Sequence, residues 1–304
     1  MMAIVERYLS LRRNLGFKLR DTAYHLRSYA KFADSHGESH IRTATAMLWA
    51  GLVPSANLRR VRYRNLTNFA RFAHAEDDQH EVPANSPFTF RTQRRTPYIY
   101  SRAEIRRLVD AAGKLAPQSV FPMRPMVYSM LFGLIAATGL RVHEALSLRL
   151  SDVHAGGILH IRETKFGKSR YVPLHPTTVA VLERYLDKRR QMPIDDDHLF
   201  VSASARRLAP SIVNYTFRNV LRAAGIKGAG GRPPRIHDLR HAFATRALER
   251  CSTQREAVSR HFVAISTYLG HAEIASTYWY FEATSQLMKN IASVTEALLQ
   301  EEQS

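Results

Sequence analysis

The sequence predicts a mainly α-helical protein with a small antiparallel β-sheet, divided into two domains. Apolar residues recur at three- and four-residue steps along most of the chain, whereas residues 156–174 switch to a two-residue period. A proline-containing segment without a helical period interrupts the pattern near residue 90. The 304 residues suffice for two hydrophobic cores. We therefore expect a helical domain at 1–83, a basic linker at 84–97 and a second domain at 98–304.

Four short helices are expected in the first domain. Asp21 is the expected N-cap of the second helix, and the apolar stretch TATAMLWAGLV predicts the third. The first and fourth helices are predicted by apolar residues with a helical period, namely Ile4, Tyr8, Leu11 and Leu15 in one and Leu58, Val61, Phe69 and Phe72 in the other. Arginines are interleaved with the last set.

The second domain begins with a helix-start signal, since Ser101 and Glu104 have the spacing of a capping box. The most apolar run, residues 126–140, is shorter than the ~18–20 residues that cross a bilayer, so it predicts a buried helix. Ile158–Ile161 and Tyr171–Val172 predict a hairpin or small meander around the turn TKFGKS. Helical patterns resume at Pro176–Arg190 and continue to the C-terminus.

The charge of the chain favours a polyanionic partner. Lys and Arg number 44 against 26 Asp and Glu, a net charge of +18, and 36 of the basic residues are arginine. Residues 1–95 carry +8 and the remainder +10. Because arginine forks match phosphate oxygens, double-stranded DNA is a better partner than a membrane. Six arginines are expected to contact the grooves or the backbone of DNA: Arg59, Arg60, Arg94, Arg95, Arg218 and Arg222. For Arg218 and Arg222, a helix face that is merely exposed to solvent is nearly as good an interpretation.

Other classes are excluded by composition. The single cysteine, Cys251, rules out an internal disulfide and a cysteine-rich zinc site. The amphipathic N-terminus lacks the apolar core of a signal peptide, so a cytoplasmic, nucleoid-associated protein is expected.

Six side chains scattered along the second domain could carry chemistry. ATGLRVHEALSL places Arg141 at the start of a helix, and RIHDLRHAFAT places His237 and Arg240 on one helical face. The predicted hairpin turn contributes Lys165, while YLGHAEIASTYWYF contributes His271 and Tyr280. No group of carboxylates is visible in the sequence that would hold a divalent metal, so neither a metal nor a cofactor is expected.

This set of residues suits phosphoryl transfer without a metal ion. Two guanidinium groups can neutralise the non-bridging oxygens of a pentavalent phosphorane. Histidine and lysine can take and give the protons of the attacking and departing hydroxyls, and a tyrosine can form a covalent phosphodiester.

The same motifs resemble those of the tyrosine recombinase, or phage integrase, family. The resemblance rests on TGLRVHEALSL, TKFGKSRYVPL, HDLRHAFAT, YLGH and a tyrosine nine residues after that histidine, and it extends over essentially the whole chain. It implies two domains that close on DNA as a C-shaped clamp. It also implies a homo-tetramer on two duplexes, with a C-terminal segment exchanged between neighbours; we expect a monomer when free.

The resemblance also implies a role for each residue. Arg141 and Arg240 bind the scissile phosphate, and His271 donates to a phosphate oxygen. Lys165 protonates the leaving 5′ hydroxyl. His237 serves as the base for Tyr280, which attacks to leave a 3′-phosphotyrosyl bond.

Simpler structural interpretations of some of these residues remain open. Arg141 can simply pair with Glu144, which we expect to orient it in either case, and Lys168 competes with Lys165. Tyr278 lies two residues from Tyr280, so on a helix it points elsewhere. His241 is expected to be structural.

The leading function is site-specific recombination, with integration or excision of a mobile element. A catalytically idle DNA-binding regulator and a type IB topoisomerase-like nicking and closing enzyme are the alternatives. The target site and any need for accessory proteins stay open.

Overall fold

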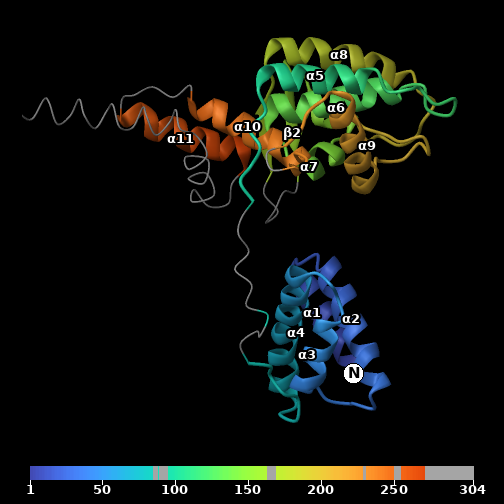
Figure 1. Ribbon diagram of the computed structural model, residues 1–304, viewed down its shortest axis with the longest axis vertical. Coiled ribbons are helices and arrows are strands. Elements are labelled where there is room, and N and C mark those ends of the chain that lie inside the picture. Colours follow the sequence, from blue (N-terminus) through green and yellow to red (C-terminus); the bar gives the residue numbers. More distant parts are fainter. Residues whose placement is uncertain (85–87, 89–94, 163–168, 229–230, 250–254, 271–304) are drawn as a thin grey trace, which may run out of the picture. The chain divides into compact units, whose positions relative to one another are not determined.

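The computed structural model describes residues 1–84, 88, 95–162, 169–228, 231–249 and 255–270, with only the backbone described at 255–259. The chain divides into two compact units, an N-terminal unit, Met1–Arg95, and a C-terminal unit, Thr96–Ser304 (Figure 1). Each unit has its own hydrophobic core.

The N-terminal unit is a bundle of helices in which α4 packs against the other three. Trp49, Tyr29 and Phe69 are among its largest fully buried side chains. The helices agree in number and order with the sequence prediction: α1 Met2–Asn14, α2 Arg20–Ser35, α3 Thr43–Gly51 and α4 Ala56–Glu76.

Two details of this unit differ from the prediction. Helix α2 begins at Arg20 and Leu19 occupies the N-cap position, so Asp21 lies inside the first turn, where its carboxylate faces the positive end of the helix. On α1 the buried face includes Val5, whereas Leu11 and Leu15 are 47% and 64% exposed. The predicted apolar stripe therefore contributes Tyr8 to the core, whereas its last two members lie outside the core.

The C-terminal unit is built around α6, which packs against α5, α8 and α10. Nine residues of α6 are buried, as its apolar sequence predicts. The capping box of Ser101 and Glu104 is formed at the start of α5. Among the described residues, the helices of this unit are α5 Arg102–Gly113, α6 Arg124–Thr138, α7 Val142–Ser147, η1 Leu150–Asp152, α8 Pro176–Arg190, α9 Pro210–Ala223, α10 Ile236–Glu249 and α11 Arg255–Leu269.

A three-stranded antiparallel sheet, in the order β1-β2-β3, completes the unit. The strands are β1 Val153–His154, β2 Ile158–Ile161 and β3 Arg170–Pro173. The meander predicted from the two-residue period is confirmed, and the two-residue strand β1, too short to give a pattern, is an addition. Leu159 pairs with Val172, and both side chains are fully buried, so one face of the sheet packs against the core.

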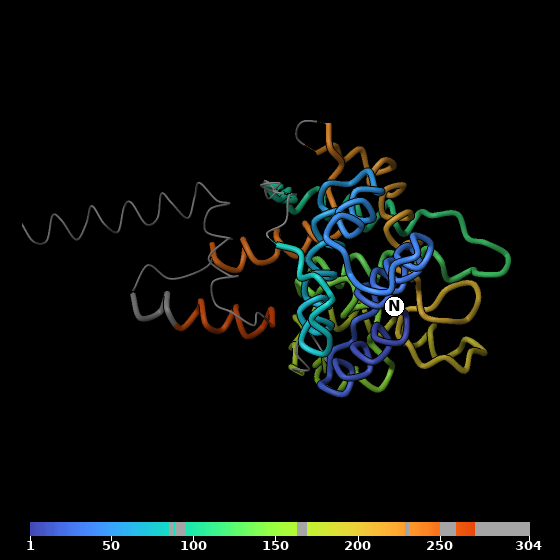
Figure 2. Tube along the Cα trace, turned by 90° about the horizontal axis from the view of Figure 1, so that it is seen from below, coloured from blue at the N-terminus to red at the C-terminus, as the bar shows by residue number. Residues whose placement is uncertain are grey.

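Helices α10 and α11 pack side by side (Figures 1 and 2). Helix α11 also contacts β3. The C-terminal end of α11 thereby comes close to both the sheet and the start of α7, although these elements are far apart in the sequence. Within the described residues, no helix is long and apolar enough to span a membrane.

Candidate active site

Arg141 lies at the boundary between two helices whose geometry is set by its own motif. Gly139 ends α6 with φ +64°, a left-handed conformation that favours glycine. A Cβ on Gly139 would lie 2.6 Å from Cδ1 of Phe243 and 2.9 Å from Cδ2 of Leu269, so α10 and α11 approach the backbone here. Arg141 then forms the N-cap of α7, as predicted, and its side chain is 32% exposed.

Glu144 orients Arg141, as the i,i+3 spacing predicts. Its Oε1 accepts from Nη1 of Arg141 at 2.8 Å, and its Oε2 accepts from the backbone N–H of Arg141 at 3.0 Å. Burial of Glu144 acts to raise the pKa of its carboxyl, but hydrogen bonds and the positive charge of Arg170, aided by Arg141, lower that pKa to about 2. Glu144 is therefore ionised at neutral pH.

Arg240 lies on α10 and is only 1% exposed. Its Nη1 donates to the carbonyl oxygen of Gly139 at 2.7 Å, and its Nη2 donates to that of Leu269 at 2.8 Å. These are carbonyls at the C-terminal ends of α6 and α11, where the helix dipole is negative. The two helix ends therefore stabilise a buried guanidinium group.

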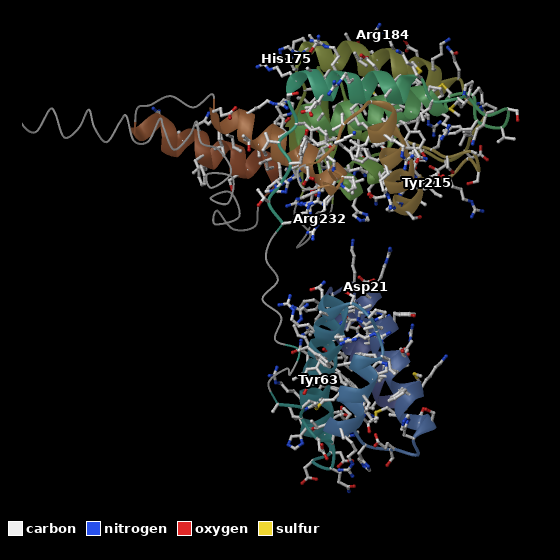
Figure 3. All side chains as sticks on the ribbon, viewed as in Figure 1. Asp21, Tyr63, His175, Arg184, Tyr215 and Arg232 are labelled. Atoms are coloured by element: carbon white, nitrogen blue, oxygen red, sulfur yellow. The ribbon has the colours of Figure 1, made fainter. Side chains whose placement is uncertain are left out.

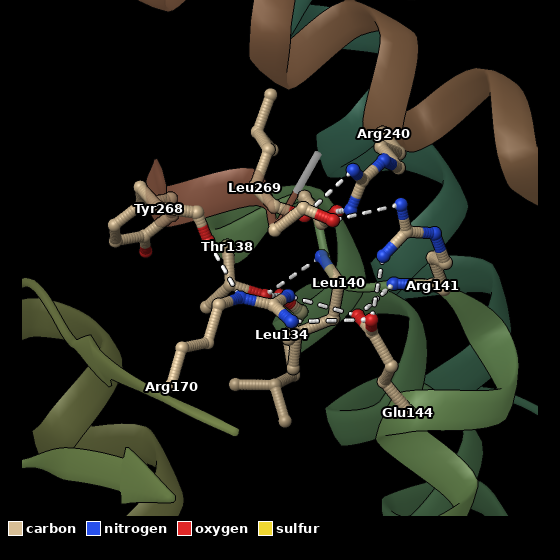
Figure 4. A network of polar contacts seen from close by, with 11 residues as sticks. Leu134, Thr138, Leu140, Arg141, Glu144, Arg170, Arg240, Tyr268 and Leu269 are labelled. Carbon is tan, nitrogen blue, oxygen red and sulfur yellow. Dashed lines mark hydrogen bonds and ion pairs between the residues drawn. The ribbon is translucent and has the colours of Figure 1, made fainter. Parts of the chain in front are cut away.

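Three consecutive carbonyls at the end of α11 each accept from a different arginine (Figure 4). Arg170 donates to Tyr268, Arg240 to Leu269 and Arg141 to Gly270. We call Tyr268–Gly270 the carbonyl turn. It gathers arginines from β3, α10 and the start of α7, and it directly precedes His271 in the sequence.

His237 stands three residues before Arg240 on α10. Part of the residue is exposed to solvent. Desolvation by the surrounding protein is the largest cause, and the charge of Arg240 the second, of a lowering of the pKa of its imidazole to about 4. The charge of Arg141 acts in the same direction, which places the three groups within electrostatic reach of one another. His237 is thus neutral at pH 7, a state that can accept a proton.

His241 packs edge-on against His237, with ring centroids 4.7 Å apart. It is 6% exposed, and burial together with the charge of His237 lowers its pKa to about 3. This position fits the structural role expected from the sequence.

Several predicted residues lie outside the described part of the chain: Lys165, Lys168, His271, Tyr278, Tyr280 and Arg94. Tyr268, the first tyrosine of YLGHAEIASTYWYF, is described. Its hydroxyl donates to the carbonyl of Pro173 at 3.3 Å, and burial raises its pKa to about 12. A half-buried phenol of raised pKa is a poor nucleophile, so Tyr268 is a packing residue.

Comparison with known proteins identifies the family of this chain. Residues 100–286 match the phage integrase family. The chain belongs to this family, that of the tyrosine recombinases.

Its relatives match most of the chain. It is 39% identical to y4rB of Sinorhizobium fredii, provisionally named an integrase/recombinase, over 94% of this chain and 93% of that protein. It is 32% identical to the tyrosine recombinase XerD of Caulobacter vibrioides, over 82% of this chain and 77% of XerD. Among solved structures, a lambda integrase tetramer bound to a Holliday junction shares the fold, with a TM-score of 0.64 and 18% identity over 92% of this chain and 76% of that one.

The arginines expected to contact DNA differ in how this tyrosine recombinase presents them. Arg59 is half-buried, and its Nε donates to the carbonyl of Val53 at 2.6 Å, which ties it to its own unit. Arg60 is exposed on α4, and Arg95 is half-buried within the segment expected to be the linker. Arg218 and Arg222 are exposed one turn apart on α9, the helix that carries the labelled Tyr215 in Figure 3. With Lys227 and other residues, these two line a cavity of about 330 Å³.

One group in the described residues departs from the expectation that no carboxylates cluster. Asp196, Asp197 and His198 bring potential ligand atoms within 4.8 Å of one another in the loop between α8 and α9. Asp196 already pairs with His198 at 2.7 Å, and Asp197 pairs with Arg149 at 3.0 Å. Solvent-facing acidic groups of this kind are common without an ion, so we assign no metal site to the loop.

The residue that sequence reasoning missed is Arg170, in the stretch KSRYVPL. It donates to both oxygens of Glu144 and to the carbonyl of Tyr268. Both partners are distant in the sequence, so no local spacing signals the contact. The sequence offers one weak signal, an arginine at the start of a short strand.

Proposed function

We propose that this chain is a site-specific DNA recombinase that cuts and rejoins DNA through a covalent 3′-phosphotyrosyl intermediate on Tyr280. One observation supports this proposal above all. Arg141 and Arg240, from separate motifs, are anchored on the same carbonyl turn, next in sequence to His271. Two guanidinium groups anchored on neighbouring carbonyls can together bind the non-bridging oxygens of a phosphodiester once both are accessible.

The two arginines would meet the phosphate differently. Arg141 keeps about a third of its side chain exposed and is held by Glu144, so it can bind a phosphate without rearrangement. Arg240 is 1% exposed, and DNA binding must therefore uncover its guanidinium. Once both are engaged, the charge that develops on the phosphorane is neutralised by fixed cations.

The proton steps fall to the remaining groups. His237, neutral at pH 7, accepts the proton of the Tyr280 hydroxyl as the Tyr280 oxygen forms its bond to phosphorus. The bond from phosphorus to the 5′ oxygen breaks, and Lys165 gives that oxygen a proton. The phosphate is an anion, so its binding raises the pKa of His237 and improves it as a base. Attack by the 5′ hydroxyl of a partner strand then releases Tyr280, with no net hydrolysis.

The substrate would be double-stranded DNA carrying a specific site, and the working assembly would be a tetramer on two duplexes. The solved lambda integrase with the same fold is a tetramer on a Holliday junction. Charges of +8 on residues 1–95 and +10 on the rest support backbone contacts from both units. The resemblance to y4rB, which is named an integrase/recombinase, supports DNA integration, and we propose that the DNA moved is a mobile element.

The experiment is covalent capture on a nicked suicide duplex built from the DNA that flanks the gene. The native protein should form an SDS-resistant adduct, and Tyr280→Phe should abolish it while leaving DNA binding within about twofold. Tyr278→Phe and Tyr268→Phe are the matched controls and should retain capture. Binding without any adduct from the native protein would indicate a regulator. Site-independent relaxation of supercoiled DNA without strand exchange would indicate a topoisomerase-like enzyme.

A further inference from the structure

Arg170 occupies the centre of the polar network in Figure 4 without being one of the residues that the proposed reaction uses. It opens β3, and its side chain is 10% exposed. Nη1 and Nη2 donate to the two oxygens of Glu144 at 3.2 and 2.9 Å, and Nε donates to the carbonyl of Tyr268 at 2.7 Å. Such a bidentate fork is a geometry that lysine cannot reproduce.

Arg170 and Arg141 share the same carboxylate. Each oxygen of Glu144 accepts one bond from Arg170 and one from Arg141, counting the Arg141 backbone N–H. Glu144 is 7% exposed, so it has little water to replace a lost partner. The position of Glu144, and through it that of the Arg141 guanidinium, therefore depends on Arg170.

Arg170 also packs against the backbone of the carbonyl turn. Gly270 has φ +66°, and a Cβ there would lie 2.7 Å from Nη1 and 2.9 Å from Cζ of Arg170. Gly270 therefore packs directly against the guanidinium group of Arg170. The carbonyl of the same Gly270 accepts from Nη2 of Arg141 at 3.2 Å. One side chain consequently fixes both the carboxylate and the turn between which Arg141 is held.

We propose that Arg170 is a positioning residue for strand cleavage: it fixes Glu144 and the carbonyl turn so that Arg141 meets the scissile phosphate in one orientation. The proposal rests on the proposed function. Arg170 touches no reacting atom. Its loss should slow the chemical step and leave DNA affinity nearly unchanged, because the phosphate contacts that dominate affinity are made elsewhere.

The test is a double-mutant cycle on the nicked suicide duplex, with R170Q, E144Q and the double variant. Single-turnover adduct formation is measured at saturating DNA, and affinity is measured by gel shift. We expect each single variant to slow adduct formation by about 100-fold, the usual cost of a small misplacement of a catalytic group. The double variant should be no slower than the slower single variant, because both changes remove one and the same support. R170K, which keeps the charge and loses the fork, should recover only a minor part of the rate.

The control is R162Q. Arg162 follows β2 on the same sheet, is 50% exposed and pairs with Asp152 rather than Glu144. R162Q removes an equal charge and should stay within about threefold of the native rate, since its half-exposed guanidinium group pairs with Asp152 and not with Glu144. A native-like rate for folded R170Q would overturn the inference, as would losses that multiply in the double variant. Absence of any adduct from the native protein would instead refute the proposed function, and the inference would fall with it.

Discussion

Arg141 and Arg240 donate to neighbouring carbonyls, those of Gly270 and Leu269, although one begins α7 and the other lies within α10. The arrangement explains how two like charges are kept close together in a site where one of them is buried. The last carbonyls of a helix carry partial negative charge, and here the ends of α6 and α11 supply them. Glu144 adds a full negative charge on the side of Arg141.

A crowded glycine makes this arrangement testable through stability. G139A should destabilise the protein by about 1–3 kcal/mol from overpacking against Phe243 and Leu269, with about 1 kcal/mol more for a left-handed alanine. Gly156 also has a positive φ, +75°, but a Cβ added there would meet no atom of the described residues within 4 Å. G156A is therefore the matched control and should show only the conformational cost. Urea unfolding followed by circular dichroism measures both, and equal losses would show that the close approach at Gly139 contributes nothing.

Two histidines predict a loss of stability in acid. The pKa of His241 is lowered to about 3 and that of His237 to about 4, from an ordinary 6.5. Below pH 6.5 these histidines bind protons in the unfolded chain but not in the folded one. The contribution of the two neutral histidines to the free energy of unfolding is therefore complete above pH 6.5 and is lost as the pH falls toward 3.

The comparison uses thermal unfolding between pH 7.5 and 4.5. H241Q should show a shallower fall of Tm with acid than the native protein, because the glutamine cannot be protonated. H154Q, at an exposed position on β1, should keep the native slope. Parallel Tm profiles for H241Q and the native protein would contradict the assignment.

Cleavage should not require a metal ion. Arginines supply the positive charge at the phosphate, so adduct formation should persist at an unchanged rate in excess EDTA. The double variant D196N/D197N removes the acidic loop group and should also cleave normally. Strict dependence on magnesium or manganese would overturn the proposed chemistry, and loss of cleavage in D196N/D197N alone would direct attention to that loop.

Local patterns predict most of the fold because they encode local structure. The capping box at Ser101, the buried helix α6 and the bounds of α8 follow from periodicity and end signals within a few residues. The differences also have local causes. Asp21 lies inside the first turn of α2 and not at its cap, and on α1 Leu11 and Leu15 fit a helical period as well as the buried Val5 does.

The site is only partly predictable for a physical reason. The pairing of Arg141 with Glu144 is an i,i+3 contact and can be deduced from spacing. The contacts of Arg170 with Glu144 and Tyr268 join elements that meet only when β3, α7 and α11 pack together. No periodic pattern in the sequence predicts these long-range contacts. The burial of Arg240 between two helix ends is likewise a product of tertiary packing.

The contribution of Arg218 and Arg222 to DNA binding can be measured separately from that of the net charge. Arg218 and Arg222 are exposed one turn apart beside a cavity, whereas Arg184 and Arg190 are exposed on α8, and Figure 3 shows Arg184 on its outer side. Each pair carries the same charge. If α9 contacts the DNA backbone, R218Q/R222Q should reduce the slope of log affinity against log salt by about 2, since each phosphate contact contributes about 0.9.

The charge-matched control R184Q/R190Q should leave that slope unchanged, although the net charge falls by the same amount. Gel shifts at several salt concentrations on one duplex measure both variants. Equal reductions would mean that DNA responds to the net charge of the molecule and not to α9. An unchanged slope in R218Q/R222Q would leave the two arginines as a solvated face, which is the alternative that the sequence itself leaves open.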